Sequence, residues 1–571
     1  MHAMIGHILQ SVDIFVILTF LISLLVAYIL WNNVTRTHNN IPGPTPWPIV
    51  GHLPILVASF FQNKSSRNRS EQFLKLQKKY GDLVCLRFGN FTLVLVFGYN
   101  KIYKVLVLNA DKTKFRPTNS AVSRKLFSKE AGVIMSNGQE WVDLRRFTMV
   151  ALKDFGVGKK SLEEKIQEEA RFLVELFSKQ NKKPFDVSKV FSKATSNIIS
   201  SIIFGSRFDF NDPDFNSLLR NIDYLFKTSR TSGNFIPLPA FLNPFDKTNM
   251  IVKNRRAIQD YIRSRIDDER RSFDPNNVRH FLDLYLQQEG KSNSKISENH
   301  LFLTLADLYV AGTDTTSVTL QWSMLYMIKY PDVQNKCRDE ILEVVGEDRD
   351  PVGKDKDNLP YVMATLHEVQ RIATIAPLAV PHLAAEDIEI DGMIIPKNAV
   401  IFPSLMSVHR DPSLWEEPDV FRPERFLFND KFVKKEGFSA FSMGPRICLG
   451  KQLAESELLL LFVSILQRFD LSKADETDEL PTITVILELF SFTDAETFNV
   501  RIFKDQSLSR VDKIRWNSID MDLGFTLKDG VLTSLKSGFY FIAVQFRCSQ
   551  KTLMTINRSS LVIATGYCNH H

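Results

Sequence analysis

One cysteine stands in a frame of residues that suits a metal-bound sulfur. Residues 441–450 read Phe-Ser-Met-Gly-Pro-Arg-Ile-Cys-Leu-Gly, so Cys448 follows Arg446 and lies between Gly444 and Gly450. The glycines permit tight turns and a close backbone approach, and nearby N–H groups can stabilise a thiolate. A buried structural cysteine is the usual alternative, but it would not explain why two glycines and an arginine surround the cysteine. The frame therefore predicts that Cys448 is a thiolate ligand of haem iron.

The pattern Phe-x-x-Gly-x-Arg-x-Cys-x-Gly at residues 441–450 resembles the haem-binding loop of the cytochrome P450 superfamily. The resemblance implies haem b (iron protoporphyrin IX) as cofactor, with Cys448 as the axial iron ligand and Arg446 beside a haem propionate. Val380-Pro-His382 and Val408-His-Arg-Asp-Pro-Ser-Leu-Trp415 further resemble the microsomal family 2 branch.

Trp141 and Arg145 are four residues apart and so share one face of a predicted helix. An indole N–H and a guanidinium on one face can clamp a carboxylate. Read alone, such a pair is more often a surface cation–π contact. By the resemblance, the carboxylate is a haem propionate. His382, which alone reads as an ordinary core or surface histidine, is then a further propionate ligand.

The segment Ala311-Gly-Thr-Asp-Thr-Thr316 interrupts a long apolar helix predicted over residues 301–327. A glycine and four consecutive polar residues are poor helix interior, and such a violation suggests a functional site. The segment resembles the family's oxygen-activating helix, in which the glycine opens a groove over the iron, and Asp314 and Thr315 would deliver protons to bound dioxygen. For Thr316 we expect only a hydrogen bond back to the preceding turn.

Glu368-Val-Gln-Arg371 places opposite charges three residues apart on a helix, which alone is a weak surface ion pair. Together with Pro423-Glu-Arg425-Phe426, it resembles the superfamily's Glu-x-x-Arg and Pro-x-Arg-Phe motifs. The resemblance implies a mostly buried triad of Glu368, Arg371 and Arg425 that holds the cysteine loop.

The elements that position these residues are predicted to be mainly helical, with small β-sheets. Apolar residues recur at helical spacing through residues 161–205 and 249–287. Two β-prone runs within residues 83–97 flank Gly89-Asn90, which is a hairpin signal. The prolines of residues 376–382 predict an extended path beside the haem. The resemblance implies the cytochrome P450 fold.

The composition is that of an ordinary folded protein. Hydrophobic residues make up 44% of the 571 residues and charged residues 24%, and 44 Phe against 13 Tyr suggest an apolar interior or pocket. A net charge of +6 without a dense basic run gives no indication of nucleic-acid binding. The five cysteines show neither disulfide nor zinc spacing, which indicates a reducing compartment.

An apolar run from Ile14 to Trp31 nearly reaches the length of a bilayer core as a helix. We expect a retained membrane anchor over residues 1–34 rather than a cleaved signal peptide, because the run is long and its leader lacks Lys and Arg. Asp13 precedes the run and Arg36 follows it, which favours a cytoplasmic body and a single pass. The prolines of residues 35–49 predict a stiff hinge.

The resemblance covers residues 50–505, and residues 506–571 do not belong to it. That tail alternates like β-strands and resembles the first half of a tumour necrosis factor-like jelly roll, which cannot close its two sheets alone. A generic β appendage is the alternative. Residues 485–497 also lack the Gly-Leu-Thr and proline pattern of the family.

The resemblance implies a haem-thiolate monooxygenase that inserts one oxygen atom from dioxygen into an apolar fatty acid, steroid or foreign compound. Its electrons would come from NADPH-cytochrome P450 reductase, with cytochrome b5 as a second donor, at the endoplasmic reticulum membrane. The substrate-pocket candidates are Phe302, Ala311, Ala376 and Val380. The alternatives are a haem-thiolate isomerase, which needs no proton relay, and a membrane-displayed signalling ligand.

Overall fold

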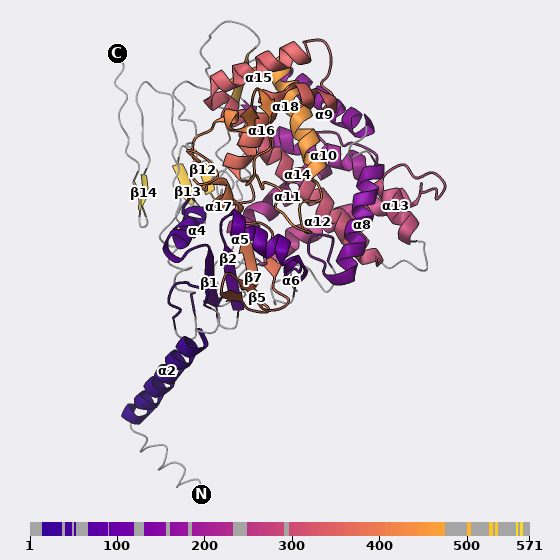
Figure 1. Cartoon of the computed structure of the whole chain (residues 1–571). Helices are drawn as coiled ribbons and strands as arrows, with labels where there is room; N and C mark the ends of the chain where they lie inside the picture. Colours follow the sequence, from indigo (N-terminus) through magenta and orange to yellow (C-terminus); the bar gives the residue numbers. More distant parts are fainter. Residues whose placement is uncertain are drawn as a thin grey trace. The chain divides into compact units, whose positions relative to one another are not determined.

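The helix that carries residues 311–316 lies in the largest hydrophobic core of the chain (Figure 1). This helix, α14 (Glu298–Lys329), begins where the Ser297 side chain accepts a hydrogen bond from the His300 N–H. Its buried residues cover most of its circumference, as expected for a helix enclosed by others. The prediction of a long helix over residues 301–327 is confirmed. Its neighbours are α10 (Val187–Ile203), α12 (Thr248–Arg270), α16 (Pro360–Ala373) and α18 (Lys451–Arg468).

The computed structural model describes residues 14–36, 40–47, 51–52, 67–88, 91–118, 131–155, 160–180, 185–231, 248–289, 296–473, 499–503, 525–528, 531–534, 555–557 and 560–562. These residues belong to two units, Met1–Lys504 and Asp505–His571. All the candidate site residues are in the first unit.

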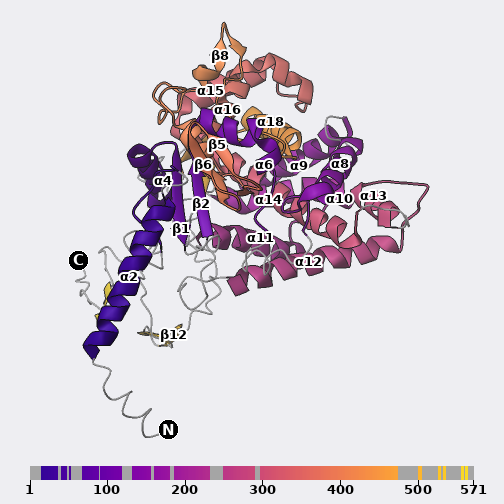
Figure 2. The same ribbon diagram turned by 60° about the horizontal axis from the view of Figure 1, so that its bottom comes forward.

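The first unit is mainly helical, as predicted. The residues with apolar helical spacing at 161–205 form helices α9 (Lys160–Lys179) and α10. Those at 249–287 form helices α12 and α13 (Phe281–Glu289). Helices α11 and α12 run side by side (Figure 2). The other helices of the body are α4 (Arg67–Tyr80), α5 (Tyr99–Tyr103), η1 (Lys104–Leu108), α6 (Ala110–Thr113), α8 (Gly138–Asp154), α11 (Pro213–Thr231), α15 (Pro331–Val344), η3 (Gly353–Asn358), α17 (Leu405–His409) and η4 (Pro423–Phe426).

A four-stranded sheet in the order β1-β2-β7-β4 accompanies the helices. Strands β1 (Leu83–Phe88) and β2 (Phe91–Val96) form the predicted antiparallel hairpin, whose turn residues lie outside the described ranges. Strand β7 (Val400–Pro403) runs parallel to β2, and β4 (His382–Leu383) pairs with β7. The sheet thus places the chain around His382 next to strands from the start of the body.

Smaller sheets complete the body. Strand β11 (Asn499–Phe503) pairs with β10 (Asp470–Lys473) and β3 (Phe185–Asp186). Two short hairpins are formed by β5 (Ile388–Ile390) with β6 (Met393–Ile395) and by β8 (Leu427–Phe428) with β9 (Lys431–Phe432).

The described part of the proline-rich segment, residues 40–47, is not helical and packs on the sheet. The Pro42 carbonyl accepts a hydrogen bond of 2.9 Å from the Cys85 N–H. A Cβ atom at Gly43 would lie 2.3 Å from the Cys85 carbonyl oxygen, so only glycine fits there. Residues 35 and 36 of the predicted hinge belong to helix α2, and the role of the segment as a hinge stays a prediction.

Helix α2 (Ile14–Arg36) occupies the apolar run that the sequence predicted as a membrane anchor. Its side chains from Val16 to Trp31 are exposed. Across the described ranges, no helix is both long enough and apolar enough to cross a membrane.

The second unit contains two described hairpins. Strand β12 (Phe525–Lys528) pairs with β13 (Val531–Ser534), and β14 (Thr555–Asn557) pairs with β15 (Ser560–Val562). The strand expected within residues 537–548 lies outside the described ranges, and the resemblance to half a jelly roll stays a prediction.

The boundary between the two units predicts that residues 506–571 are not needed for the stability of the body. We expect truncation after Asp505 to leave the Tm of the body unchanged, because β11 and its pairing partners remain. A matched control, truncation after Lys473, also removes β11 and should lower the Tm, since β10 and β3 then lose their shared partner. Differential scanning calorimetry of the three chains decides, and a lower Tm for the longer truncation would show that the boundary is wrong.

Candidate active site

The loop around Cys448 is held by backbone hydrogen bonds on both sides of the sulfur. The Cys448 N–H donates to the Phe441 carbonyl at 3.0 Å, and the Gly450 N–H donates to the Cys448 sulfur. The side chain is accessible on one side, directly before the N-terminus of α18. Surrounding protein atoms raise the pKa of the thiol, whereas the Gly450 N–H and the Arg145 charge oppose this shift. The loop thus offers a sulfur with a donor aimed at it, as a thiolate ligand requires.

The two glycines of the loop serve different purposes. Gly444 has a φ of +76°, and a Cβ atom there would lie 2.2 Å from the Leu106 carbonyl oxygen of η1. Both the backbone conformation and the close approach therefore require glycine. Gly450, in contrast, has a φ of −83° and open space around its Cα, and its contribution is the N–H that reaches the sulfur.

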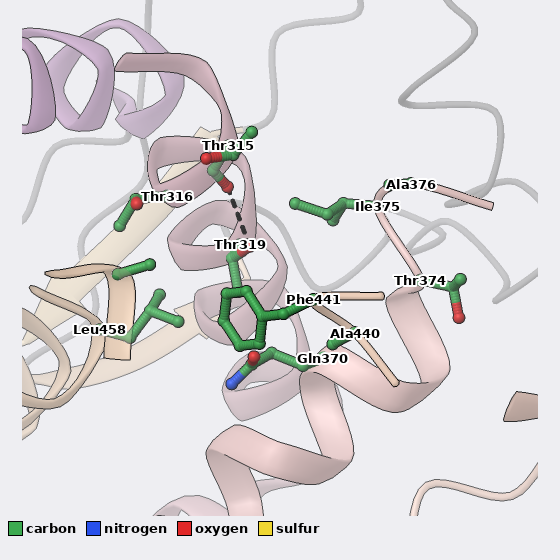
Figure 3. A pocket seen from close by; sticks show the side chains of 11 residues that line it. Thr315, Thr316, Thr319, Gln370, Thr374, Ile375, Ala376, Ala440, Phe441 and Leu458 are labelled. Atoms are coloured by element: carbon green, nitrogen blue, oxygen red, sulfur yellow. Dashed lines mark hydrogen bonds between the residues drawn. The ribbon is translucent and has the colours of Figure 1, made fainter. Parts of the chain in front are cut away.

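A cavity separates the cysteine loop from α14 (Figure 3). Threonines of α14 line one side, the end of α16 and the residues after it line a second, and the cysteine loop with α18 lines a third. The lining residues are Thr315, Thr316, Thr319, Gln370, Thr374, Ile375, Ala376, Ala440, Phe441, Ala454 and Leu458. The cavity therefore joins two motifs that lie more than a hundred residues apart in the sequence.

Basic side chains gather at the start of the cysteine loop. Arg446 donates to the carbonyls of Lys114 at 2.8 Å and Ser136 at 2.6 Å, and Arg145 donates to the Ile447 carbonyl at 2.8 Å. Burial, then Arg116 and Arg145, lower the pKa of Arg446 to about 8.

Arg116 is a member of this cluster that the sequence analysis missed. Its guanidinium donates to the Val380 carbonyl at 2.8 Å and to the Pro381 carbonyl at 2.9 Å. Burial, then Arg145, lower its pKa to about 9. The signal in the sequence is only Phe-Arg-Pro at residues 115–117, which no local pattern marks as functional.

Trp141 and His382 complete the group. The Arg446 guanidinium lies 3.9 Å from the centroid of the Trp141 ring, and the buried Trp141 Nε1–H has no acceptor in the described part of the chain. The His382 Nδ1 lies 2.7 Å from the Thr113 carbonyl. Burial, then Arg116 and Arg446, lower the pKa of His382 to about 3.

These groups fit an anionic ligand. The charges that act on Arg446 and Arg116 are those of other arginines, and an orphaned indole N–H lies beside them. Buried cations of one sign are stabilised when an acidic group pairs with them. Two carboxylates entering from the cavity would relieve the repulsion and accept the spare donors.

The two threonines of α14 next to the cavity differ in exposure. Thr315 bonds back to the Ala311 carbonyl at 2.9 Å, although its side chain is exposed. Thr316 is buried, and its hydroxyl lies near enough to Glu457 of α18 to oppose the rise that burial causes in the pKa of that carboxyl group. The expectation that Thr316 bonds back to the preceding turn stays a prediction.

Two other residues of this turn lie away from the cavity lining. Asp314 is only 8% exposed. At Gly312 a Cβ atom would lie 3.2 Å from Ile199 of α10, so the glycine serves close packing of α10 against α14. The expected opening of a groove over the iron by this glycine stays a prediction.

The structure brings Glu368, Arg371 and Arg425 together in the core. The Glu368 carboxylate accepts from the Arg371 guanidinium at 2.7 and 2.8 Å, and from Arg425 Nε at 2.9 Å. Neither Glu368 nor Arg371 has exposed surface. Arg371 also donates to the His409 carbonyl at 2.7 Å.

His409, a second residue that the sequence analysis missed, connects this triad to the cysteine loop. The Ser439 N–H donates to its Nε2 at 3.1 Å, so the proton of the neutral ring is on Nδ1, which lies 2.9 Å from the Thr374 hydroxyl. Burial, then Arg371, lower the pKa of His409 to about 3, which keeps the ring neutral. The ring thus joins Thr374, whose hydroxyl donates to the Arg371 carbonyl, to Ser439, whose carbonyl accepts from the Ser442 N–H of the cysteine loop at 2.9 Å.

The four substrate-pocket candidates are dispersed. Ala376 lines the cavity, whereas Phe302, Ala311 and Val380 are not among its lining residues. Phe302 is buried in the core with Arg263 over its ring, and Val380 is 43% exposed.

Comparison with known proteins agrees with the site. A model of the cytochrome P450 family matches residues 41–490. Cytochrome P450 2B4 of Oryctolagus cuniculus is 38% identical over 472 residues, which cover 81% of this chain and 93% of that protein. Cytochrome P450 2U1 of Homo sapiens is 36% identical over 482 residues (80% and 88%), and cytochrome P450 2J2 of Homo sapiens is 39% identical over 443 residues (76% and 86%).

Proteins of that family bind haem b, whose two propionates are the acidic groups that the basic cluster lacks. The residues present fit this cofactor: a sulfur that accepts from the Gly450 N–H, and near it the buried arginines and the orphaned Trp141 N–H.

The first prediction for the site concerns the sulfur. Cys448→Ser should abolish the thiolate-type spectrum of the reduced carbon-monoxide complex, because an alcohol is a harder and weaker donor than a thiolate. Cys337→Ser is the matched control, since Cys337 is buried between α15 and α16, where it bonds to Thr365. An unchanged spectrum in the Cys448 variant would remove the sulfur from the site.

The second prediction concerns the triad. Glu368→Gln should lower the free energy of unfolding by about 3–5 kcal/mol and reduce haem retention, because it leaves two buried guanidinium groups without a counter-charge. Glu416→Gln is the control, because Glu416 pairs with Arg422 at the surface and its side chain is 80% exposed. Denaturant unfolding with haem quantification measures both, and equal stability of the two variants would refute the triad's role.

Proposed function

The chain belongs to the cytochrome P450 family and is a haem-thiolate monooxygenase, and we propose the following roles for its residues. Cys448 binds the iron, and the basic cluster binds the propionates. Asp314 and Thr315 deliver protons on the opposite side of the cavity. The observation that carries the proposal is the cavity itself, since Thr315 lines one side and the cysteine loop lines another (Figure 3).

Bound haem supplies the one-electron and dioxygen chemistry, to which a thiolate ligand contributes electron density that favours O–O cleavage. The Gly450 N–H and the approach of α18 by its N-terminus stabilise negative charge on Cys448. Arg145 lies close enough to act on the same sulfur electrostatically.

The propionates would be held by Trp141, Arg145, Arg446, Arg116 and His382. Trp141 offers its unused N–H, and the guanidinium groups offer positive charge. His382 directs one ring nitrogen to the Thr113 carbonyl, so it can donate to a propionate through Nε2 only as an imidazolium. The propionate charge favours that protonation.

The proton path would run from buried Asp314 to Thr315. The Thr315 hydroxyl donates to the Ala311 carbonyl, and its oxygen still has lone pairs that can accept a hydrogen bond. It can therefore accept a proton from one partner while passing its own to another. Asp314 does not line the cavity and would act through Thr315 or a water molecule.

The substrate class is an apolar organic molecule: a fatty acid, a steroid or a foreign compound. Ala376 lines the cavity, and Phe302, Ala311 and Val380 remain candidates for the wider pocket. Apolar contacts discriminate weakly between similar shapes, so they do not define one substrate. Electrons come from NADPH-cytochrome P450 reductase, with cytochrome b5 as a second donor.

We propose that the protein resides at the endoplasmic reticulum membrane, with its catalytic body in the cytoplasm and a single pass at the N-terminus. Support comes from the microsomal relatives and from the exposed apolar side chains of α2. Carbonate extraction and protease protection of sealed microsomes test this topology, and a body protected from protease would refute it.

Thr315→Ala tests the proton path. The variant should keep the thiolate spectrum but divert electrons from NADPH to hydrogen peroxide, because protonation of bound dioxygen is impaired. The control is Ser323→Ala, since the Ser323 hydroxyl makes the same kind of bond, to the Thr319 carbonyl at 2.9 Å, two turns further along α14. Equal product per NADPH in all three proteins would refute the role of Thr315.

A further inference from the structure

The side chain of Asn137 does not bond as its position predicts. Asn137 is the N-cap residue of α8, where an asparagine normally accepts a hydrogen bond from an N–H of the first helical turn, but its side chain makes no such bond. Instead, its Oδ1 accepts from the Arg116 N–H at 2.7 Å. Its Nδ2 donates to the Arg116 carbonyl at 3.0 Å and to the Thr118 hydroxyl at 3.3 Å. The amide is thus used on a distant segment and not on its own helix.

The backbone around Arg116 suits this pairing. Pro117 follows Arg116, and the residue before a proline favours an extended conformation. An extended residue directs its N–H and its C=O to the same edge, so one side-chain amide can pair with both, as a neighbouring strand would. On the opposite edge, the Phe115 carbonyl accepts from the Leu383 N–H of β4 at 2.8 Å. The segment is therefore held between β4 and the start of α8.

The Arg116 guanidinium is fixed on one side and open on another. Its Nε donates to the Ile134 carbonyl at 3.2 Å, and its Nη1 donates to the carbonyls of Val380 at 2.8 Å and Pro381 at 2.9 Å. The remaining nitrogen, Nη2, has no acceptor among the described residues, although it carries two N–H donors. The direction in which Arg116 can bind an anion therefore depends on where its backbone is held.

Asn137 connects the elements that carry the other propionate candidates. Directly after it comes α8, which carries Trp141 and Arg145. The segment that it holds is paired with β4, which carries His382. The hydrogen bonds of Asn137 thus join the Arg116 backbone to the helix on one side of the proposed propionate site.

We propose that Asn137 is a positioning residue of the cofactor site: its side-chain amide holds the Arg116 backbone against the start of α8 and so directs the Arg116 guanidinium toward a haem propionate. This inference rests on the proposed role of Arg116 in binding a propionate. It gives a reason for an N-cap asparagine that does not cap its helix.

A second pairing of the same kind supplies a matched control. The Asn197 side chain of α10 accepts from the Phe208 N–H at 2.9 Å and donates to the Phe208 carbonyl at 3.0 Å. Asn197 is fully buried, and Phe208 belongs to the largest hydrophobic core. Asn197→Ala therefore removes the same two bonds, but from a phenylalanine and not from an arginine of the basic cluster.

The first test measures the rate at which the full-length holoprotein loses haem to an excess of apomyoglobin. Asn137→Ala should speed this loss roughly tenfold, the factor that one charge-assisted hydrogen bond is worth. Asn137→Ser should speed it equally, because serine can cap α8 but is too short to pair with both backbone groups of Arg116. Asn197→Ala should lower the Tm and leave the rate unchanged. A wild-type rate in Asn137→Ser would show that the residue only supports the helix, and would overturn the inference.

The second test measures the midpoint potential of the haem iron, which a loss of fold stability alone does not move. Asn137→Ala should lower the potential, because a propionate charge without its guanidinium disfavours the added electron. Asn197→Ala should keep the wild-type potential. An unchanged potential in Asn137→Ala would contradict the inference, since the Arg116 charge would then be where it was.

A double-mutant cycle with Arg116→Met separates this inference from the proposed role of Arg116. Arg116→Met keeps the backbone that Asn137 pairs with, so adding Asn137→Ala should not speed haem loss further. An equal added effect in both backgrounds would overturn the inference alone. So would faster haem loss in Arg116→Met together with wild-type loss in Asn137→Ala. Wild-type haem loss and potential in Arg116→Met would overturn both, because Arg116 would then bind no propionate.

Discussion

The burial of like charges beside the cysteine loop is the constraint on which the site depends. Arg116, Arg145 and Arg446 satisfy many of their N–H donors on backbone carbonyls, but the charges that lower the pKa of Arg446 are those of the other two. Hydrogen bonds to carbonyls orient a guanidinium without neutralising it. The three arginines are therefore largely hydrogen-bonded but not neutralised within the cluster, and the propionates that we propose as their ligands would supply the missing negative charge.

The triad differs from this cluster, because it contains its own carboxylate. Glu368 supplies one counter-charge, shared by Arg371 and Arg425, inside the protein. Arg371 also donates to the backbone carbonyl of His409, whose neutral ring accepts from the Ser439 N–H just before the cysteine loop. The triad is thus tied to the chain that leads into the cysteine loop by hydrogen bonds within the protein.

The parts of the fold and of the site that depend on a local sequence motif could be predicted from the sequence. The hairpin at residues 83–97, the long helix at 301–327 and the cysteine loop each carry their signal within a few residues. Arg116 and His409 could not be found this way, because their roles depend on carbonyls and N–H groups contributed by residues 264 and 30 positions away, respectively. The signalling-ligand alternative fails for a different reason, since the family match spans residues 41–490.

The threonines of α14 show why even a correct motif leaves the roles of neighbouring residues open. Successive residues on a helix point about 100° apart, so Thr315 and Thr316 must face different surroundings. In a half-exposed helix the apolar stripe would reveal which of them faces inward. Helix α14 is buried on most of its circumference, so its sequence has no such stripe. Only the packing shows that Thr316 is buried while Thr315 is exposed, although both line the cavity.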